Sequence, residues 1–215
     1  MKRWILLFSL SFLVGNIALG GRNKDSLRIA REIYAIRATE HIYINGRLDE
    51  NVWGKSDFAN NFTIYEPYNG QKASQQTEVS VLYDDFAIYI GARLFDTSPD
   101  SIFRELGQRD NSDRLRSDAF SVYLSTYNDG VNYLQFTVSA SGVQTDIKIT
   151  SNQSDRNWNA VWESAVGFDS LGWIVEMKIP YSALRFSKNV NQVWGINFSR
   201  LIKRKNEVST WNFVD

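Results

Sequence analysis

Aromatic and amide side chains gather in residues 155–163, which read Asp-Arg-Asn-Trp-Asn-Ala-Val-Trp-Glu. Sugars present apolar C–H faces that stack on Trp and Tyr rings, and nearby amides, acids and arginines satisfy the sugar hydroxyls. Trp158 follows polar loop residues and precedes a strand, so its ring can stay exposed without disturbing a sheet. We expect Trp158 to stack on a sugar whose hydroxyls contact further candidate residues: Arg156, Asn157, Asn159, Asp118 and Arg200.

The same aromatic residues also fit a structural role. Even spacing places Trp158 and Trp162 on one face of a strand, and large rings bury most of their surface in folded proteins. The pattern leaves an exposed and a buried Trp158 equally open, and it favours a buried Trp162. Three other tryptophans, Trp53, Trp173 and Trp194, are predicted to lie in the core.

A second stretch is rich in oxygen ligands. It contains Asp110, Asn111, Ser112 and Asp113, and Asp118 follows it. Calcium is bound by such clusters of carboxylate and carbonyl oxygens, although the glycine-centred spacing of an EF-hand is missing here. The sequence therefore predicts a calcium site with Asp110, Asp113 and Asp118 as candidate ligands, and a solvated polar loop is the alternative.

The residues needed for catalysis are few. His41 is the only histidine and the chain has no cysteine, which argues against a zinc or copper site and against a catalytic triad. A glycoside hydrolase needs only two carboxylates, and the candidates are Asp118, Asp146, Glu163 and Glu176. Glu176 occupies the polar face of an alternating segment, and scattered acids are normally solvated. We therefore expect no catalytic residues.

Short alternating segments must position all of these residues. Val, Ile, Tyr, Phe and Thr recur with a period of two, and turn residues interrupt them every eight to twelve positions. This pattern predicts an all-β, antiparallel β-sandwich with one or two short helical turns. Asp49 is the predicted N-cap of one such turn, which runs through Trp53. The residues predicted to fill the core are Phe120, Val122, Leu124, Phe136, Val138, Ile174 and Trp194.

The first residues are typical of an export signal. Lys2 and Arg3 precede an apolar run from Trp4 to Val14, and small residues follow, so residues 1–21 are predicted to be a signal peptide. We expect a linker or a short helix at 22–37 and the sandwich at 38–215. A closing strand would normally follow the last residues, which leaves open whether the chain is part of a longer protein. Without the signal peptide the chain is nearly neutral, which argues against a nucleic-acid partner.

Five motifs of the chain resemble the carbohydrate-binding module family 9-like domains, in the same order. They are residues 46–53 (GRLDENVW), 77–84 (TEVSVLYD), 87–91 (AIYIG), 117–124 (SDAFSVYL) and 172–180 (GWIVEMKIP). The resemblance implies a β-sandwich that binds carbohydrate, in a family with calcium-binding members. Sugar-binding members tend to carry an aromatic residue and an acid where this chain has Leu115 and Ser121.

A further set of motifs is similar to the N-terminal domain of envelope proteins whose C-terminal half resembles an outer-membrane β-barrel. These motifs include residues 142–146 (GVQTD), 158–162 (WNAVW), 184–186 (LRF) and 194–197 (WGIN). The resemblance implies a location in the periplasm, in the outer membrane or at the cell surface of a Gram-negative bacterium. A downstream barrel would then be a partner of the domain.

Three functions agree with these observations. The first is an exported, non-catalytic carbohydrate-binding module that binds a polysaccharide or oligosaccharide during polysaccharide catabolism. The second is a scaffold or protein-interaction domain of a barrel-bearing protein, and the third is a module of a glycoside hydrolase that acts on O-glycosyl bonds. An exposed Trp or Tyr beside a polar groove would favour the first function, whereas an open sheet edge or a continuous apolar patch would favour the second.

Overall fold

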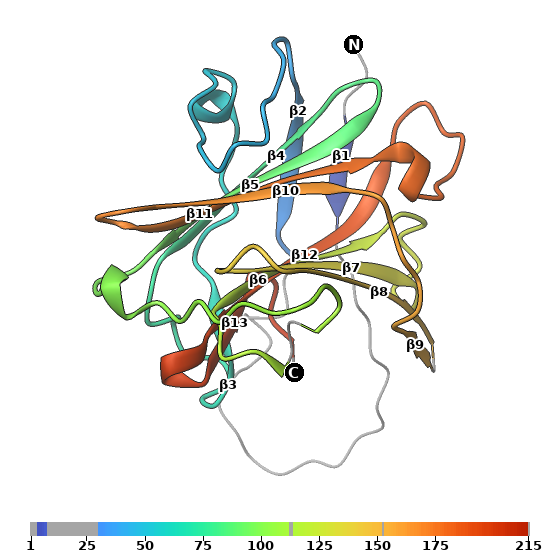
Figure 1. The fold of residues 1–215 in the computed structure, drawn as a ribbon. Helices are drawn as coiled ribbons and strands as arrows, with labels where there is room; N and C mark the ends of the chain where they lie inside the picture. The colour runs from blue at the N-terminus through green and yellow to red at the C-terminus, as the bar shows by residue number, and fades with distance from the viewer. Residues whose placement is uncertain (1–3, 8–29, 112–113, 152, 215) are drawn as a thin grey trace.

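The strands form two layers that pack face to face, as Figure 1 shows. The structure is a computed structural model, and it describes residues 4–7, 30–111, 114–151 and 153–214. Helix among these residues is limited to the 3-10 turns Trp53–Lys55, Pro99–Ser101, Tyr181–Ala183 and Lys203–Lys205. The β-sandwich with short helical turns that the sequence predicts is therefore confirmed.

One layer, called sheet one here, contains five strands. In spatial order they are β10 (Glu163–Asp169), β11 (Gly172–Pro180), β5 (Ala87–Phe95), β4 (Thr77–Tyr83) and β2 (Glu32–Arg37). The pairs β10–β11, β11–β5 and β4–β5 are antiparallel, and β2 pairs with β4 in the parallel sense.

The other layer, called sheet two, contains seven strands. They are β9 (Gln153–Asp155), β8 (Gln144–Thr150), β7 (Tyr133–Ser139), β6 (Ala119–Ser125), β12 (Val193–Ile202), β13 (Glu207–Thr210) and β3 (Thr63–Glu66), again in spatial order. The meander β6–β7–β8 follows from tight turns at the ends of these strands. Strand β1 (Trp4–Leu7) pairs with both β2 and β12 and so connects the two sheets.

The core lies between the sheets and follows the period of two along each strand. Six of the seven residues predicted to fill it are fully buried: Phe120, Val122, Leu124, Phe136, Val138 and Trp194. The prediction for Ile174 is wrong, because β11 turns Trp173 and Val175 inward and leaves Ile174 half-buried on the outer face. A shift of one residue moves every side chain of a strand to the other face.

Two local predictions near the N-terminal end also differ from the structure. The turn at Trp53–Lys55 begins after Val52 and has no side-chain cap, so Asp49 is not its N-cap. Residues 32–37, expected to lie in a linker or a short helix, form strand β2. The predicted signal peptide contains β1, and its other residues lie outside those described. Within the described ranges no helix is long and apolar enough to span a membrane.

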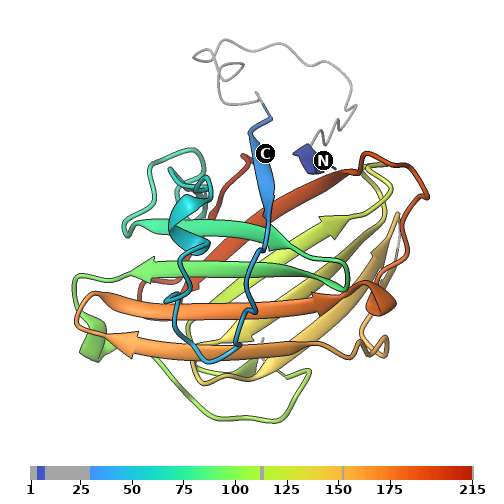
Figure 2. The same cartoon turned by 90° about the horizontal axis from the view of Figure 1, so that it is seen from above.

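The outer face of sheet one is covered by residues 38–56, which Figure 2 shows in front of its strands. Trp53 is buried there with Leu82 and Tyr89 in a small apolar cluster outside the main core. Gly91 on β5 makes room for the ring, because a Cβ at this position would lie 2.7 Å from Trp53 and from Leu48. The cover therefore packs so closely on the sheet that Gly91 leaves no room for a Cβ.

Glu176 anchors the middle of this cover. Its Oε2 accepts hydrogen bonds from the backbone N–H groups of Asn45, Gly46 and Arg47 at 2.9, 2.7 and 3.1 Å. Gly46 has φ +82°, and a Cβ there would lie 2.6 Å from the carbonyl oxygen of Val166. Burial raises the pKa of Glu176 to about 7, against the effect of the three donors. One carboxylate thus attaches the covering segment to the sheet.

Candidate functional site

The outer face of sheet two carries a groove of about 310 Å³. Three aromatic rings line it: Tyr65 from β3, Tyr123 from β6 and Tyr133 from β7. The remaining lining residues are Asn197 and Ser199 from β12, Val208 and Thr210 from β13, and Val214. These side chains point outward because their strand neighbours of opposite parity, such as Val122 and Phe198, fill the core.

The depth of the groove changes from its middle to its ends. Asn197, Ser199 and Thr210 are 5%, 8% and 8% exposed and form the floor. Tyr65 at one end is 36% exposed, and Tyr133 at the other end is half-buried. The rings of Tyr123 and Tyr133 meet edge to face, with centroids 6.0 Å apart. Aromatic walls therefore stand on either side of a polar floor.

The polar groups of the groove are held in place from below. Asn197 Oδ1 accepts from the backbone N–H groups of Phe198 and Asn212, and its Nδ2 donates to the Asn212 carbonyl at 3.2 Å. One N–H of the Asn197 amide is left for another partner.

Tyr123 and Tyr133 are neutral hydrogen-bond donors and acceptors. Burial raises the pKa of Tyr123 and of Tyr133 above the ordinary value. A neutral phenol can both donate and accept a hydrogen bond, as can the hydroxyls of Ser199 and Thr210. The groove therefore combines apolar ring faces with uncharged hydrogen-bonding groups.

The loop that carries Trp158 lies elsewhere in the molecule. Arg156, Asn157 and Asn159 are exposed, but Trp158 is half-buried. Its ring packs edge to face against Phe136 in the core, with centroids 5.8 Å apart. The structure thus brings four of the predicted site residues onto one loop and gives the central ring a packing role. Whether this loop contacts a sugar stays a prediction.

Trp162 and its neighbours are fixed by a buried acid. Asp146 on β8 accepts from the indole N–H of Trp162 at 3.1 Å and from the backbone N–H of Ala160 at 2.6 Å, and Arg109 also pairs with it. Trp162 is 5% exposed, as expected of a core residue. The acid that the sequence offered as a hydrolase candidate therefore holds the loop in place.

Asp118 and Arg200 were predicted to meet sugar hydroxyls, and this assignment is wrong. Both side chains are fully buried between the sheets, so a sugar on the surface cannot reach them. Arg200 donates to the carbonyl oxygens of Gln76 and Phe95 at 2.9 and 2.8 Å. Asp118 Oδ1 accepts from the backbone N–H of Lys203 at 3.0 Å. The even positions of β12 face inward, and Arg200 follows Phe198 on that face.

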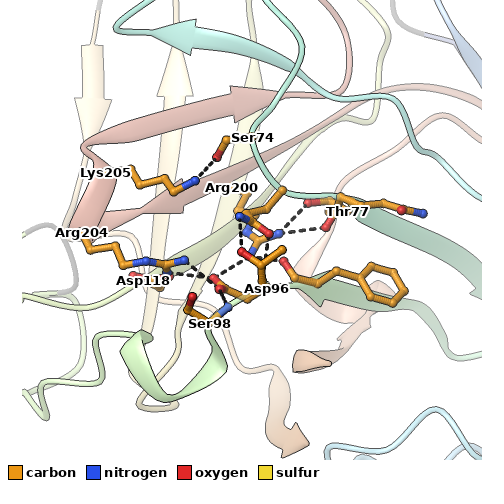
Figure 3. A network of polar contacts seen from close by, with 12 residues as sticks. Ser74, Thr77, Asp96, Ser98, Asp118, Arg200, Arg204 and Lys205 are labelled. Carbon is orange, nitrogen blue, oxygen red and sulfur yellow. Dashed lines mark hydrogen bonds and ion pairs between the residues drawn. The ribbon is translucent and has the colours of Figure 1, made fainter. Parts of the chain in front are cut away.

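Figure 3 shows the network to which these two residues belong. Asp96 accepts two hydrogen bonds from Arg204, at 2.7 and 2.8 Å, and its Oδ2 lies 3.8 Å from Arg200. Burial lowers the pKa of Arg200 to about 10 and raises that of Asp118. Burial alone would also raise the pKa of Asp96, but the bonds from Arg204 and Ser98 keep it below its ordinary value. The network ties β12 of sheet two to the ends of β4 and β5.

The predicted calcium ligands do not form a cluster among the residues that the structure describes. Asp118 belongs to the buried network, whereas Asp110 accepts from the backbone N–H of Asp146 at 3.3 Å and pairs with Arg109. Asp113 lies outside the described residues. No group of three or more histidine or acidic side chains is placed to hold a metal ion within the described ranges. Calcium binding stays a prediction.

Comparisons with known proteins identify the family. The sequence profile described as carbohydrate family 9 binding domain-like matches residues 44–211. The chain belongs to this family. No curated protein matches it in sequence.

Three solved structures share the fold of this family 9-like domain. A carbohydrate-binding module family 9 from Caldicellulosiruptor kristjanssonii in complex with cellotriose has a TM-score of 0.56 and 14% identity, over 82% of this chain and 80% of that chain. A structure of such a module from the same organism in complex with glucose has a TM-score of 0.55 and 14% identity, over 82% of this chain and 83% of that chain. A protein from Bacteroides uniformis ATCC 8492 has a TM-score of 0.55 and 14% identity, over 84% of this chain and 88% of that chain. At this identity the likeness shows the fold alone.

The tyrosine groove contains none of the site residues predicted from the sequence. The alternation of Phe120, Val122 and Leu124 already places Tyr123 on the outer face of its strand, which was a usable signal. The other end of the groove gave no such signal, because Tyr65 reaches it only through the pairing of β3 with β13. That pairing joins segments far apart in the sequence.

Proposed function

We propose that the protein is a non-catalytic carbohydrate-binding module and that the groove of Tyr65, Tyr123 and Tyr133 is its binding site. The observation that carries the proposal is the composition of the groove, which combines aromatic faces with hydroxyl and amide groups on the outer face of sheet two. Sugars need these two kinds of contact at once. Membership of the family supports the proposal, and so do the cellotriose and glucose named for the structural neighbours.

The groove favours an uncharged glycan. None of its lining residues carries a formal charge. A uronate or sulfate group would lose hydration on entering the groove and would find no cation there, which is costly. The hydroxyls of an uncharged sugar can instead pair with Ser199, Thr210 and the free N–H of Asn197. We therefore expect neutral glucans and xylans to bind and polygalacturonate not to bind.

Isothermal titration calorimetry with soluble xylan, cellulose oligosaccharides and mixed-linkage glucans tests the proposal. We expect a dissociation constant between micromolar and millimolar for the wild type, as is typical of small interfaces. Tyr133→Ala should weaken binding by about tenfold or more, because it removes one aromatic wall. Tyr127→Ala is the matched control, since Tyr127 is 59% exposed and lies outside the groove.

Each other outcome has a defined meaning. If Trp158→Ala weakens binding and Tyr133→Ala does not, the loop is the site and the groove is not. If the folded wild type binds no glycan in a broad panel, the scaffold interpretation replaces carbohydrate binding. Circular dichroism of each variant shows that loss of binding is not loss of folding.

We also propose that the domain is exported and serves polysaccharide catabolism in the envelope of a Gram-negative bacterium. The basic and apolar start of the chain supports export. Expression of the full chain in a Gram-negative host, followed by N-terminal sequencing of the periplasmic and membrane fractions, tests this part. We expect a start near residue 22, and an intact Met1 in the cytoplasmic fraction would contradict it.

A further inference from the structure

The lining residues of the groove come from five neighbouring strands. Tyr65 lies on β3, Thr210 on β13, Ser199 on β12, Tyr123 on β6 and Tyr133 on β7. These strands follow one another in sheet two in this order, and each pairs with the next. The groove therefore crosses the strands obliquely, because Tyr65 lies level with Arg200 and Leu201 of β12, whereas Tyr133 lies level with Gly195.

The strand spacing sets the length of the groove. Neighbouring strands lie about 4.8 Å apart and residues along a strand about 3.3 Å apart, so four strand intervals and an offset of about five residues place the backbones of Tyr65 and Tyr133 roughly 25 Å apart. A pyranose unit in an extended chain advances by roughly one strand spacing. A single sugar can contact Tyr65 or Tyr133, but it cannot contact both.

We propose that the groove binds an extended stretch of at least four sugar units that runs obliquely across the strands, with Tyr65 and Tyr133 stacking on its two ends. This inference rests on the proposed function of the groove and adds the length and direction of its ligand. The floor residues Asn197, Ser199 and Thr210 then meet the hydroxyls of the central units, and Tyr123 lies beside these units.

Two features of the groove support this assignment. The floor is nearly buried, whereas Tyr65 and Tyr133 are more exposed, so the aromatic faces stand at the ends. Short hydroxyl side chains also stand opposite each other across the strands, since Ser199 pairs in register with Thr210 on one side and with Ser121 on the other. Of this row, Ser199 and Thr210 line the groove and present hydroxyl groups to the central sugar units.

Calorimetric titration of a length series tests the inference. The probes are glucose, cellobiose, cellotriose, cellotetraose and cellohexaose, and xylo-oligosaccharides of equal lengths serve if the glucans do not bind. We expect cellotetraose to bind at least about tenfold more tightly than cellobiose. Cellohexaose should bind at least as tightly as cellotetraose, because Tyr65 and Tyr133 lie at least four sugar units apart.

Variants at the two ends sharpen the test. Tyr65→Ala and Tyr133→Ala should each lower the affinity for cellotetraose by about tenfold. They should lower the affinity for cellobiose much less, because a disaccharide can bind to the floor of the groove alone. Borohydride-reduced cellotetraitol tests whether a free reducing end is needed, and we expect it to retain most of the affinity. Tyr127→Ala is the control in both series.

The results separate this inference from the proposed function. Glucose binding as tightly as cellotetraose, or a strict need for the free reducing end, would overturn the groove of at least four units and leave carbohydrate binding intact. Equal losses for cellobiose and cellotetraose in both variants would also overturn it. No binding of any sugar, with folding verified, would instead remove the proposed function itself.

Discussion

The two outer faces of the sandwich differ, because one is covered by another segment of the chain and the other carries a groove. Sheet one is covered by residues 38–56, and the outward residues beneath this cover include the apolar cluster of Leu82 and Tyr89 and the buried acid Glu176, which bonds to the cover. Sheet two carries serine, threonine, asparagine and tyrosine at equivalent outward positions and keeps an open groove. The comparison indicates that outward residues of sheet one stabilise the fold, whereas those of sheet two are available for a ligand.

The largest effect is expected at the centre of the cover. Trp53→Ala should lower the free energy of unfolding by about 3 to 5 kcal/mol, because it removes a large ring that is 3% exposed. Urea denaturation followed by circular dichroism measures this change. Asp49→Ala is the control and should change little, since Asp49 caps no helix. A Trp53→Ala protein as stable as the wild type would show that the cover does not stabilise the sheet.

The anchor of the cover should make stability depend on pH. The pKa of Glu176 rises from 4.5 to about 7 on folding, so the folded state binds the proton more tightly than the unfolded state does. The resulting stabilisation is fully present below pH 4.5 and is lost as the pH rises through 7, with an upper bound of about 3 kcal/mol. Urea unfolding of wild type and Glu176→Gln across this range measures the contribution. We expect the difference in unfolding free energy between them to change with pH, and a constant difference would contradict the assignment.

A smaller loss of stability is expected where the cover touches the sheet most closely. Gly91→Ala places a Cβ 2.7 Å from the Trp53 ring and from Leu48. Overpacking of this kind typically costs about 1 to 3 kcal/mol. Gly54→Ala is a matched control, because no atom lies within 4 Å of the Cβ it would add. Thermal unfolding of both variants should separate them, and equal midpoints would mean that Trp53 moves aside freely.

The smallest effect is expected on the open face and should appear in binding alone. Tyr123→Phe removes one hydroxyl from the groove and keeps the ring, so the affinity for cellotetraose should fall by about 0.5 to 1.5 kcal/mol. The free energy of unfolding should stay within about 0.5 kcal/mol of wild type. Calorimetry and urea denaturation on the same preparation measure both values. A loss of stability equal to that of Gly91→Ala would erase the distinction between the two faces.

Much of the fold could be predicted from the sequence because alternation is a local property. The strands around Phe120, Val122 and Leu124 and the meander that follows them are examples. Ile174 shows the limit of assigning single residues, because it shares its face with Glu176 and Lys178, and only the whole strand identifies the inner face of Trp173, Val175, Met177 and Ile179. Asp49 shows another limit, since the chain enters the 3-10 turn through Val52 without a capping side chain.

The site was harder to predict than the fold because it depends on contacts between distant segments. Arg200 has the chemistry of a ligand contact, but its even position on β12 turns it toward the core and into a network with Asp96. Trp158 is flanked by amides that would suit a sugar contact, but its ring packs against Phe136. The composition of a segment gave the right kinds of residue, whereas register and long-range pairing decided which of them face solvent.

The pairing of β13 with β3 also sets when the groove can exist during folding. Glu66 is in register with Val208, so one aromatic wall comes from an early segment and part of the floor from a late one. Contacts of such large sequence separation are slow to form, because the intervening chain must first be ordered. The groove can therefore form only after β13 has left the ribosome and paired with β3. Glycan binding at the proposed site would then show that the chain has completed its folding.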